Sequence, residues 1–229
     1  MIIGIAAILA APETLKRRRG AKLQIRVGVP EGQFRGFATF LAPAAFLMSF
    51  LDATLLSLAP LYMADTLHVR NIALFGLVGF LVLAAGGFTP LVFRTLEPRR
   101  AVMAGVCAST VFSLLIVAAS AFDTAVLVIV AAAVIGFTNG LILQGATSIA
   151  GIVVPIEERG KLVSALYMCA YSGTVPSVAL GYLSRGIGLT ATMAVFSALA
   201  ATIATFVMTV GRRNLRVVVP YRAGGDAAS

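Results

Sequence analysis

One carboxylic acid stands in the middle of a long apolar stretch of this sequence. Asp52 is the only Asp, Glu, Lys, Arg or His well inside such a stretch. An unpaired carboxylate in hydrocarbon costs on the order of several kcal/mol, so it normally faces a cavity or carries a proton. Buried acids can also pass protons on. Two roles are open to Asp52: a place on a solute or proton path, or a hydrogen bond to a neighbouring helix that only locks the structure.

Amide and phenol side chains occur in other apolar stretches. Asn139 and Gln144 fall in the fourth stretch. Tyr167 and Tyr171 are four residues apart in the fifth, a spacing that places both on one face of a helix. With Tyr62, at the end of the first stretch, they would make a polar lining if those faces meet. The alternative is that they hold membrane helices together, at about 1 kcal/mol or less each.

The apolar stretches themselves predict the elements that position these residues. The 229 residues are 59% hydrophobic and 12% charged, with a mean hydropathy of +0.98, whereas soluble domains have about 45–50% apolar and about 25% charged residues. The apolar runs are about twenty residues long, the length of a helix that crosses a bilayer. Irregular backbone cannot face lipid, so the runs must be helices. We expect an all-α integral membrane protein with six spans, at 37–63, 72–93, 101–121, 125–154, 162–183 and 189–210.

The basic residues indicate how these spans are oriented. The net charge is +9, and nearly all Lys and Arg lie in the short gaps between apolar runs, which is a sign of membrane topology and not of nucleic-acid binding. With six spans, all of the 18 Lys and Arg except Arg70 and Arg185 fall on one side. By the positive-inside rule that side is the cytoplasm, and both ends of the chain lie there.

Four segments follow from this pattern. Residues 1–11 are apolar but too short to cross a bilayer, and we interpret them as the remnant of a preceding span. Residues 12–36 form a basic cytoplasmic linker that anionic headgroups would attract. Residues 37–211 form the six-helix bundle, and residues 212–229 are a basic cytoplasmic tail.

The sequence lacks the familiar motifs of enzymes, metal sites and cofactor sites. The sequence has one histidine, His68, in a predicted outer loop. Cys107 and Cys169 lie in apolar runs, where a thiol behaves as a small hydrophobe. The chain has no Cys-x-x-Cys pair, no P-loop, no His-Glu-x-x-His motif and no Gly-x-Gly-x-x-Gly turn after a strand. We therefore expect no metal, no cofactor and no enzymatic activity.

Three segments carry a resemblance to a known family. They are the basic linker after Pro12, Glu13 and Thr14, the loop LEPRRAVMAG at 96–105, and the segment VPIEERGKLVSALYMCAYSGTVPSVALGYLSRGIGL at 154–189. Together they resemble the C-terminal half of a major facilitator superfamily transporter. The resemblance implies two inverted three-helix repeats and a substrate path beside that family's helices seven, eight, ten and eleven. Asp52, Asn139, Gln144 and Tyr171 fall on three of those helices.

The inner loop departs from the family's Gly-x-x-x-Asp-Arg-x-Gly-Arg-Arg motif. Arg99 and Arg100 remain, as a trace of the motif in a cytoplasmic loop, but Thr95, Leu96 and Pro98 stand where Asp, Arg and Gly would be. The resemblance therefore does not support a gating ion pair in this half.

By resemblance, the expected function is secondary active transport of a small solute by alternating access, with proton coupling open and efflux slightly favoured. The expected location is the cell membrane (the inner or plasma membrane). The family rocks two six-helix halves about a central site, so this chain needs a missing N-terminal half or a second half-transporter. It is either a fragment or a half-size protein. The alternative is a non-transporting six-helix partner or scaffold protein in the membrane.

Overall fold

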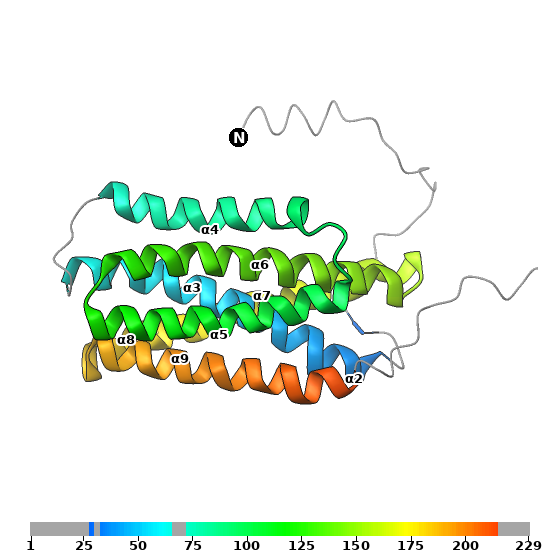
Figure 1. Ribbon diagram of the computed structural model, residues 1–229. Coiled ribbons are helices and arrows are strands. Elements are labelled where there is room, and N and C mark those ends of the chain that lie inside the picture. The colour runs from blue at the N-terminus through cyan, green and yellow to red at the C-terminus, as the bar shows by residue number, and fades with distance from the viewer. Residues whose placement is uncertain (1–27, 30–32, 66–71, 215–229) are drawn as a thin grey trace, which may run out of the picture.

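The computed structural model describes residues 28–29, 33–65 and 72–214, and all regular structure within them is helical (Figure 1). The expected remnant 1–11, most of the expected linker 12–36 and nearly all of the expected tail 212–229 lie outside the described residues, as do His68 and Arg70.

The described helices are long and apolar enough to cross a membrane six times, which confirms the six expected spans. The first span is one continuous rod made of α2, a π-helical segment η1 and α3. The last is a similar rod made of α9, η2 and α10. The bounds are α2 Phe34–Gly36, η1 Phe37–Leu41, α3 Ala42–Asp65, α4 Ile72–Val92, α5 Pro98–Phe122, α6 Ala125–Val153, α7 Ile156–Ser172, α8 Val175–Ile187, α9 Leu189–Phe206, η2 Val207–Gly211 and α10 Arg212–Asn214.

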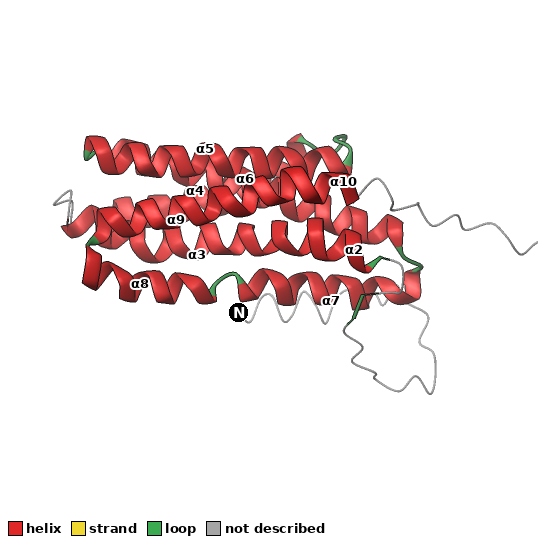
Figure 2. Ribbon diagram, turned by 90° about the horizontal axis from the view of Figure 1, so that it is seen from below, coloured by secondary structure: helices red, strands yellow, loops and turns green. Residues whose placement is uncertain are grey.

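The fifth span differs most from the sequence-based expectation. Its helix begins at Ile156 instead of residue 162, because the charged stretch before 162 lowers hydropathy without breaking the helix. An ion pair at i, i+3 spacing, from Lys161 Nζ to Glu158 Oε1 at 2.9 Å, supports this first part. The span is also divided at Gly173 and Thr174 into α7 and α8, which lie nearly in line (Figure 2).

The six spans form two repeats of three, α3 to α5 and α6 to α9, in which α7 and α8 together make one span. The first span of each repeat packs against the second span of the other repeat: α3 against α7 and α8, and α6 against α4. The first helices also pack against each other, as do the last helices, α5 and α9. This arrangement is that of the two three-helix repeats that the resemblance implied.

Aromatic rings fill the core between the two repeats. Phe196 of α9 makes edge contacts with Phe50 of α3 and Phe112 of α5, with ring centroids 5.1 and 6.1 Å apart. All three rings are fully buried. Because the core ties α3, α5 and α9 together, it fixes the rotation of α3 and hence the direction of Asp52.

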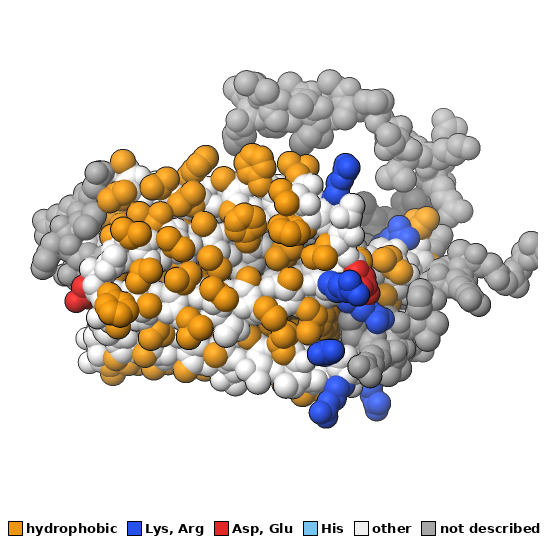
Figure 3. Space-filling model, viewed as in Figure 1, with side chains coloured by type: hydrophobic (Ala, Val, Ile, Leu, Met, Phe, Trp, Pro, Cys, Tyr) orange, Lys and Arg blue, Asp and Glu red, His pale blue; other side chains and the backbone are white. Residues whose placement is uncertain are grey.

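The basic side chains are concentrated at one end of the molecule. In the space-filling view the Lys and Arg side chains gather at one end and the remaining surface is mostly apolar (Figure 3). Among the described residues, every Lys and Arg except Arg185 lies at the end where α2 and α5 begin and α10 ends. We call this the basic end.

Candidate solute pathway

Asp52 of α3 and Asn139 of α6 meet halfway along the bundle. The carboxyl group of Asp52 is within hydrogen-bonding reach of the Asn139 side chain. Asn139 is the central residue of α6, and Asp52 lies near the middle of the rod that begins with α2. The two residues that the sequence singled out separately are thus brought together near the middle of the membrane.

This pair keeps two oxygens without donors. Among the described residues, Oδ1 of Asp52 and Oδ1 of Asn139 are both buried and accept no hydrogen bond. Buried polar atoms are nearly always paired, so such exceptions call for an explanation. A carboxylate offers only acceptors and an amide oxygen is also an acceptor. The site can therefore bind a proton, or accept a hydrogen bond from a water molecule or from an N–H or O–H group of a solute.

Small residues on α6 place Asn139 at this depth. A Cβ atom at Gly136 would lie 2.6 Å from the carbonyl oxygen of Val82, and one at Gly140 would overlap Thr89. These glycines on both sides of Asn139 let α4 approach closely, as small residues do in membrane helices. The face of α6 toward α4 is thereby fixed, and Asn139 is directed toward α3.

Tyr167 and Tyr171 lie on the outer surface of α7. Their rings are stacked, with centroids 6.2 Å apart, and the residues are 38% and 69% exposed. Within the described residues, no hydrogen bond joins either tyrosine to Asp52 or Asn139. The structure confirms that the two share one face, and a place on the solute path stays a prediction for both.

Gln144 points to a different contact. Its Nε2 donates a hydrogen bond of 3.1 Å to the carbonyl oxygen of Phe93, directly after α4. The amide therefore satisfies a backbone acceptor at the end of that helix. Its Oε1 is buried and accepts no hydrogen bond from the part of the chain that the structure describes.

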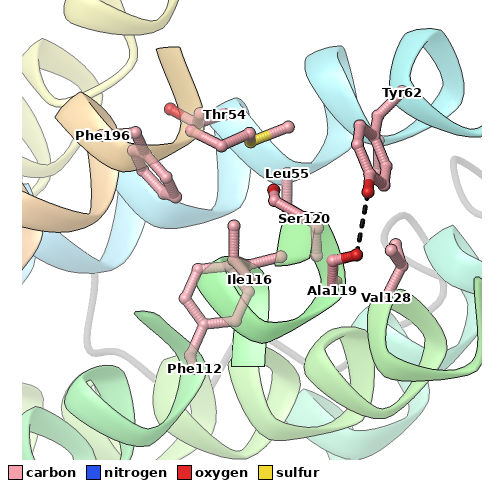
Figure 4. A pocket seen from close by; sticks show the side chains of 11 residues that line it. Thr54, Leu55, Tyr62, Phe112, Ile116, Ala119, Ser120, Val128 and Phe196 are labelled. Carbon is pink, nitrogen blue, oxygen red and sulfur yellow. Dashed lines mark hydrogen bonds between the residues drawn. The ribbon is translucent and has the colours of Figure 1, made fainter. Parts of the chain in front are cut away.

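Tyr62 does not line a polar path. It is only 2% exposed, and its hydroxyl donates to the carbonyl oxygen of Ala119 at 2.9 Å (Figure 4). A longer contact of 3.4 Å reaches Oδ1 of Asp123. Asp123 ends α5 in a left-handed conformation, with φ of 47°, and sequence analysis missed it. A polar Asp-Thr pair between two apolar runs is the signal that could have indicated this turn.

Figure 4 shows a small apolar pocket next to Tyr62, between α3, α5, α6 and α9. Thr54 lines it, and the hydroxyl of Thr54 is buried without a hydrogen-bond partner among the described residues. Sequence analysis did not single out Thr54, because a threonine in an apolar run usually bonds to its own helix.

Arg99 and Arg100 lie in the first turn of α5, at the basic end. Nε of Arg100 is 3.1 Å from Oε2 of Glu97, and both side chains are more than half exposed. An exposed pair of this kind contributes about 0.2–1 kcal/mol. This pair is local to the start of α5, and it does not join one repeat to the other.

Comparison with known proteins identifies the family to which this architecture belongs. The model of the Major Facilitator Superfamily matches residues 1–178. A search of curated proteins finds no match. The family match covers most of the chain, and six spans arranged as two three-helix repeats agree with half of that fold. The chain therefore belongs to the major facilitator superfamily of membrane transporters.

Proposed function

We propose that this protein is the C-terminal half of a secondary active transporter that moves a small solute by alternating access, with Asp52 and Asn139 on the transport path. The observation that carries the proposal is that two neighbouring polar side chains at mid-depth, Asp52 and Asn139, each keep a buried oxygen (Oδ1) without a donor among the described residues. Ionisable groups are kept inside membrane spans mainly where a proton, ion or solute must bind.

The chemistry of the pair supports a proton as one ligand. Protonated Asp52 gains an O–H donor and loses its charge, which removes most of the cost of holding it in the membrane. Asn139 cannot ionise, so it can accept or donate a hydrogen bond in either state of Asp52. A solute hydroxyl or amine could compete with the proton for the same oxygens, and such competition couples proton and solute movement.

The charge distribution supports a cytoplasmic position for the basic end. All described Lys and Arg except Arg185 lie there, and cytoplasmic loops carry the excess of positive charge in membrane proteins. Both ends of the chain would then face the cytoplasm of a cell in whose inner or plasma membrane the protein sits. The direction of transport does not follow from the charges; the family resemblance alone slightly favours efflux.

A second half is required for this function, because alternating access needs two bodies that rock about a site between them. The exposed face of α4 supports such a partner. Only 17% of the membrane-spanning part of α4 is buried, compared with 50% for the first and fourth spans. Large apolar side chains cover this face, including Phe80, Leu83 and Phe88. An N-terminal half or a second half-transporter would cover them.

The first test needs no knowledge of the solute. Infrared difference spectra of the purified protein at several pH values should show a carboxylic acid C=O band that comes and goes with pH. The band should disappear in Asp52→Asn. It should persist in the control Asp123→Asn, which removes a carboxyl group from the turn after α5.

Transport is then measured in the complete protein, paired with its other half. An antibody to the tail first establishes whether the native polypeptide has the 23.7 kDa mass of this chain or a larger one. Asp52→Asn should reduce uptake or efflux of the transported solute by tenfold or more, about 1.4 kcal/mol, while Asp123→Asn keeps it. Unchanged transport with unchanged pH dependence would rule out a role for Asp52. A change in stability alone would favour the scaffold function.

A further inference from the structure

A groove opens between α3, α7 and α9 on the basic side of the break in the fifth span. Beyond the break, α8 packs against α9, whereas α7 packs mainly against α3. α7 and α9 therefore diverge on this side of the break, and α3 forms the floor between them. The groove is wide open on one side and has a volume of about 490 Å³. Its lining includes Pro43 and Phe46 of α3, Cys169 of α7, and Ile203 and Phe206 of α9.

The lining is apolar in chemical terms, although two hydroxyl groups belong to it. Ser172 donates to the carbonyl oxygen of Cys169 at 2.7 Å, and Thr202 donates to that of Ala198 at 2.8 Å. Each hydroxyl thus bonds to its own helix and offers no free donor. Since all lining residues belong to membrane-spanning helices, water is a poor occupant and a hydrocarbon chain is a good one.

Three arginines lie beyond the groove, toward the basic end. There, η1 and η2 pack together: Nδ2 of Asn214 donates to Oγ1 of Thr39 at 3.3 Å, and Gly211 packs against the Thr39 carbonyl. Arg35 is one turn before Thr39 and bonded to it through its carbonyl oxygen. Arg212 and Arg213 directly follow Gly211. These three side chains are exposed, and none forms an ion pair with an acid among the described residues.

We propose that this groove and its arginines bind one anionic phospholipid. One acyl chain lies in the groove against Phe46 and Phe206, and the phosphodiester is held by Arg35, Arg212 and Arg213. Guanidinium groups are well suited to phosphate oxygens, and basic pockets between helices at the cytoplasmic face bind anionic headgroups. The contact between Thr39 and Asn214 sets the depth in the membrane at which the acyl chain of the lipid joins its headgroup.

The sequence contains no tryptophan, which permits a direct test in the full chain. Phe206→Trp introduces one fluorophore in the groove. Leu114→Trp introduces a control on α5, a helix that does not line the groove, where Leu114 is 65% exposed. Each protein is reconstituted in bilayers in which dibrominated phosphatidylglycerol or dibrominated phosphatidylcholine replaces part of the unlabelled lipid. Bromine quenches tryptophan only at close contact.

In the F206W protein, the binding constant of phosphatidylglycerol at the groove should exceed that of phosphatidylcholine by about fivefold or more. One surface arginine alone contributes about that factor. The L114W protein should show almost no preference. In the F206W protein, combining Arg35→Gln, Arg212→Gln and Arg213→Gln should abolish the preference. Should F206W fail to fold, Ile203→Trp offers a second position in the groove.

Two results would overturn the proposal. One is equal quenching of the F206W protein by the two lipids, which would mean that the groove does not select an anionic headgroup. The other is the same preference at both tryptophan positions, or a preference that survives loss of the three arginines. That result would show only a general attraction of anionic lipid to a basic protein.

Discussion

Two groups of helices are equivalent by the two repeats: α6 with α4 and α5, and α3 with α7, α8 and α9. We call the first group the closed set and the second the open set, because their helices differ in how closely they pack. In the first, Gly136 and Gly140 meet α4, and Gly105 and Gly145 form the contact between α5 and α6, with no room for a Cβ atom at any of the four. In the second, α3 packs less extensively against its partners, α9 above all, and a groove lies between α3, α7 and α9. One arrangement of helices therefore gives a closed or an open contact, depending on residue size.

The break in the fifth span explains why the second set stays open. Gly173 lies against the backbone of Phe46, with no room for a Cβ atom, and Pro176 follows in the first turn of α8. Glycine and proline are the usual causes of helix kinks. The close contact at Gly173 holds α7 and α8 against α3 at one point, and α7 diverges from α9 on the basic side of it. The second set is thus the one that can bend.

The largest predicted effect tests the closed contact. Gly140→Val should lower the free energy of unfolding by about 3 kcal/mol, the upper part of the usual range for overpacking, because its side chain would overlap Thr89 and the Gly86 carbonyl oxygen. The measurement is unfolding by SDS in mixed micelles, followed by circular dichroism.

The matched control is Gly79→Val. Gly79 lies in α4 with open space where its Cβ would be, so the same substitution should cost well under 1 kcal/mol. If both variants unfolded at the same SDS concentration, the contact between α4 and α6 would not be the rigid one.

A smaller effect is expected at the open contact. Gly173→Ala should cost about 1–1.5 kcal/mol, even though the added methyl group would meet the carbonyl oxygen of Phe46. The groove beside α7 gives that helix room to shift, which α6 lacks. Gly181→Ala on α8, where nothing lies within 4 Å, is the control. A loss as large as that of Gly140→Val, in the same SDS titration, would mean that the two sets are equally rigid.

The difference between the two sets also marks what could be predicted from sequence. Hydropathy and charge identify six spans because they depend only on residues near in the sequence. Asp52 and Asn139 could be chosen as candidates for the same reason. Their meeting could not be predicted, since it depends on how α3 and α6 are rotated, and the aromatic core and the glycines of α6 set that rotation.

The tyrosines also show that sequence alone does not reveal which way a side chain in a span faces. A polar side chain in an apolar run can face a path, the lipid or a backbone acceptor, and sequence does not distinguish these cases. Tyr171 is mostly exposed and Tyr62 is buried, although both were expected to line one surface. The distinction rests on one long-range contact, between residues that are 57 apart in sequence.

That contact yields the smallest predicted effect, because it joins the end of α3, in the open set, to the end of α5, in the closed one. Tyr62→Phe keeps the buried ring but leaves the carbonyl oxygen of Ala119 without the hydroxyl that donates to it at 2.9 Å. Hydrogen bonds between membrane helices contribute about 0.6 kcal/mol on average, so the free energy of unfolding should fall by about that amount. Tyr182→Phe is the control: Tyr182 is exposed on α8, and its ring, which lies near the Arg185 guanidinium, is retained.

The double variant Tyr62→Phe with Gly173→Ala tests whether the two sites act independently. The two losses of unfolding free energy should simply add, because the two sites lie at different heights on α3. A combined loss well above the sum would show that Tyr62 and Gly173 together hold α3 in place, and that the open set depends on the closed set for its order.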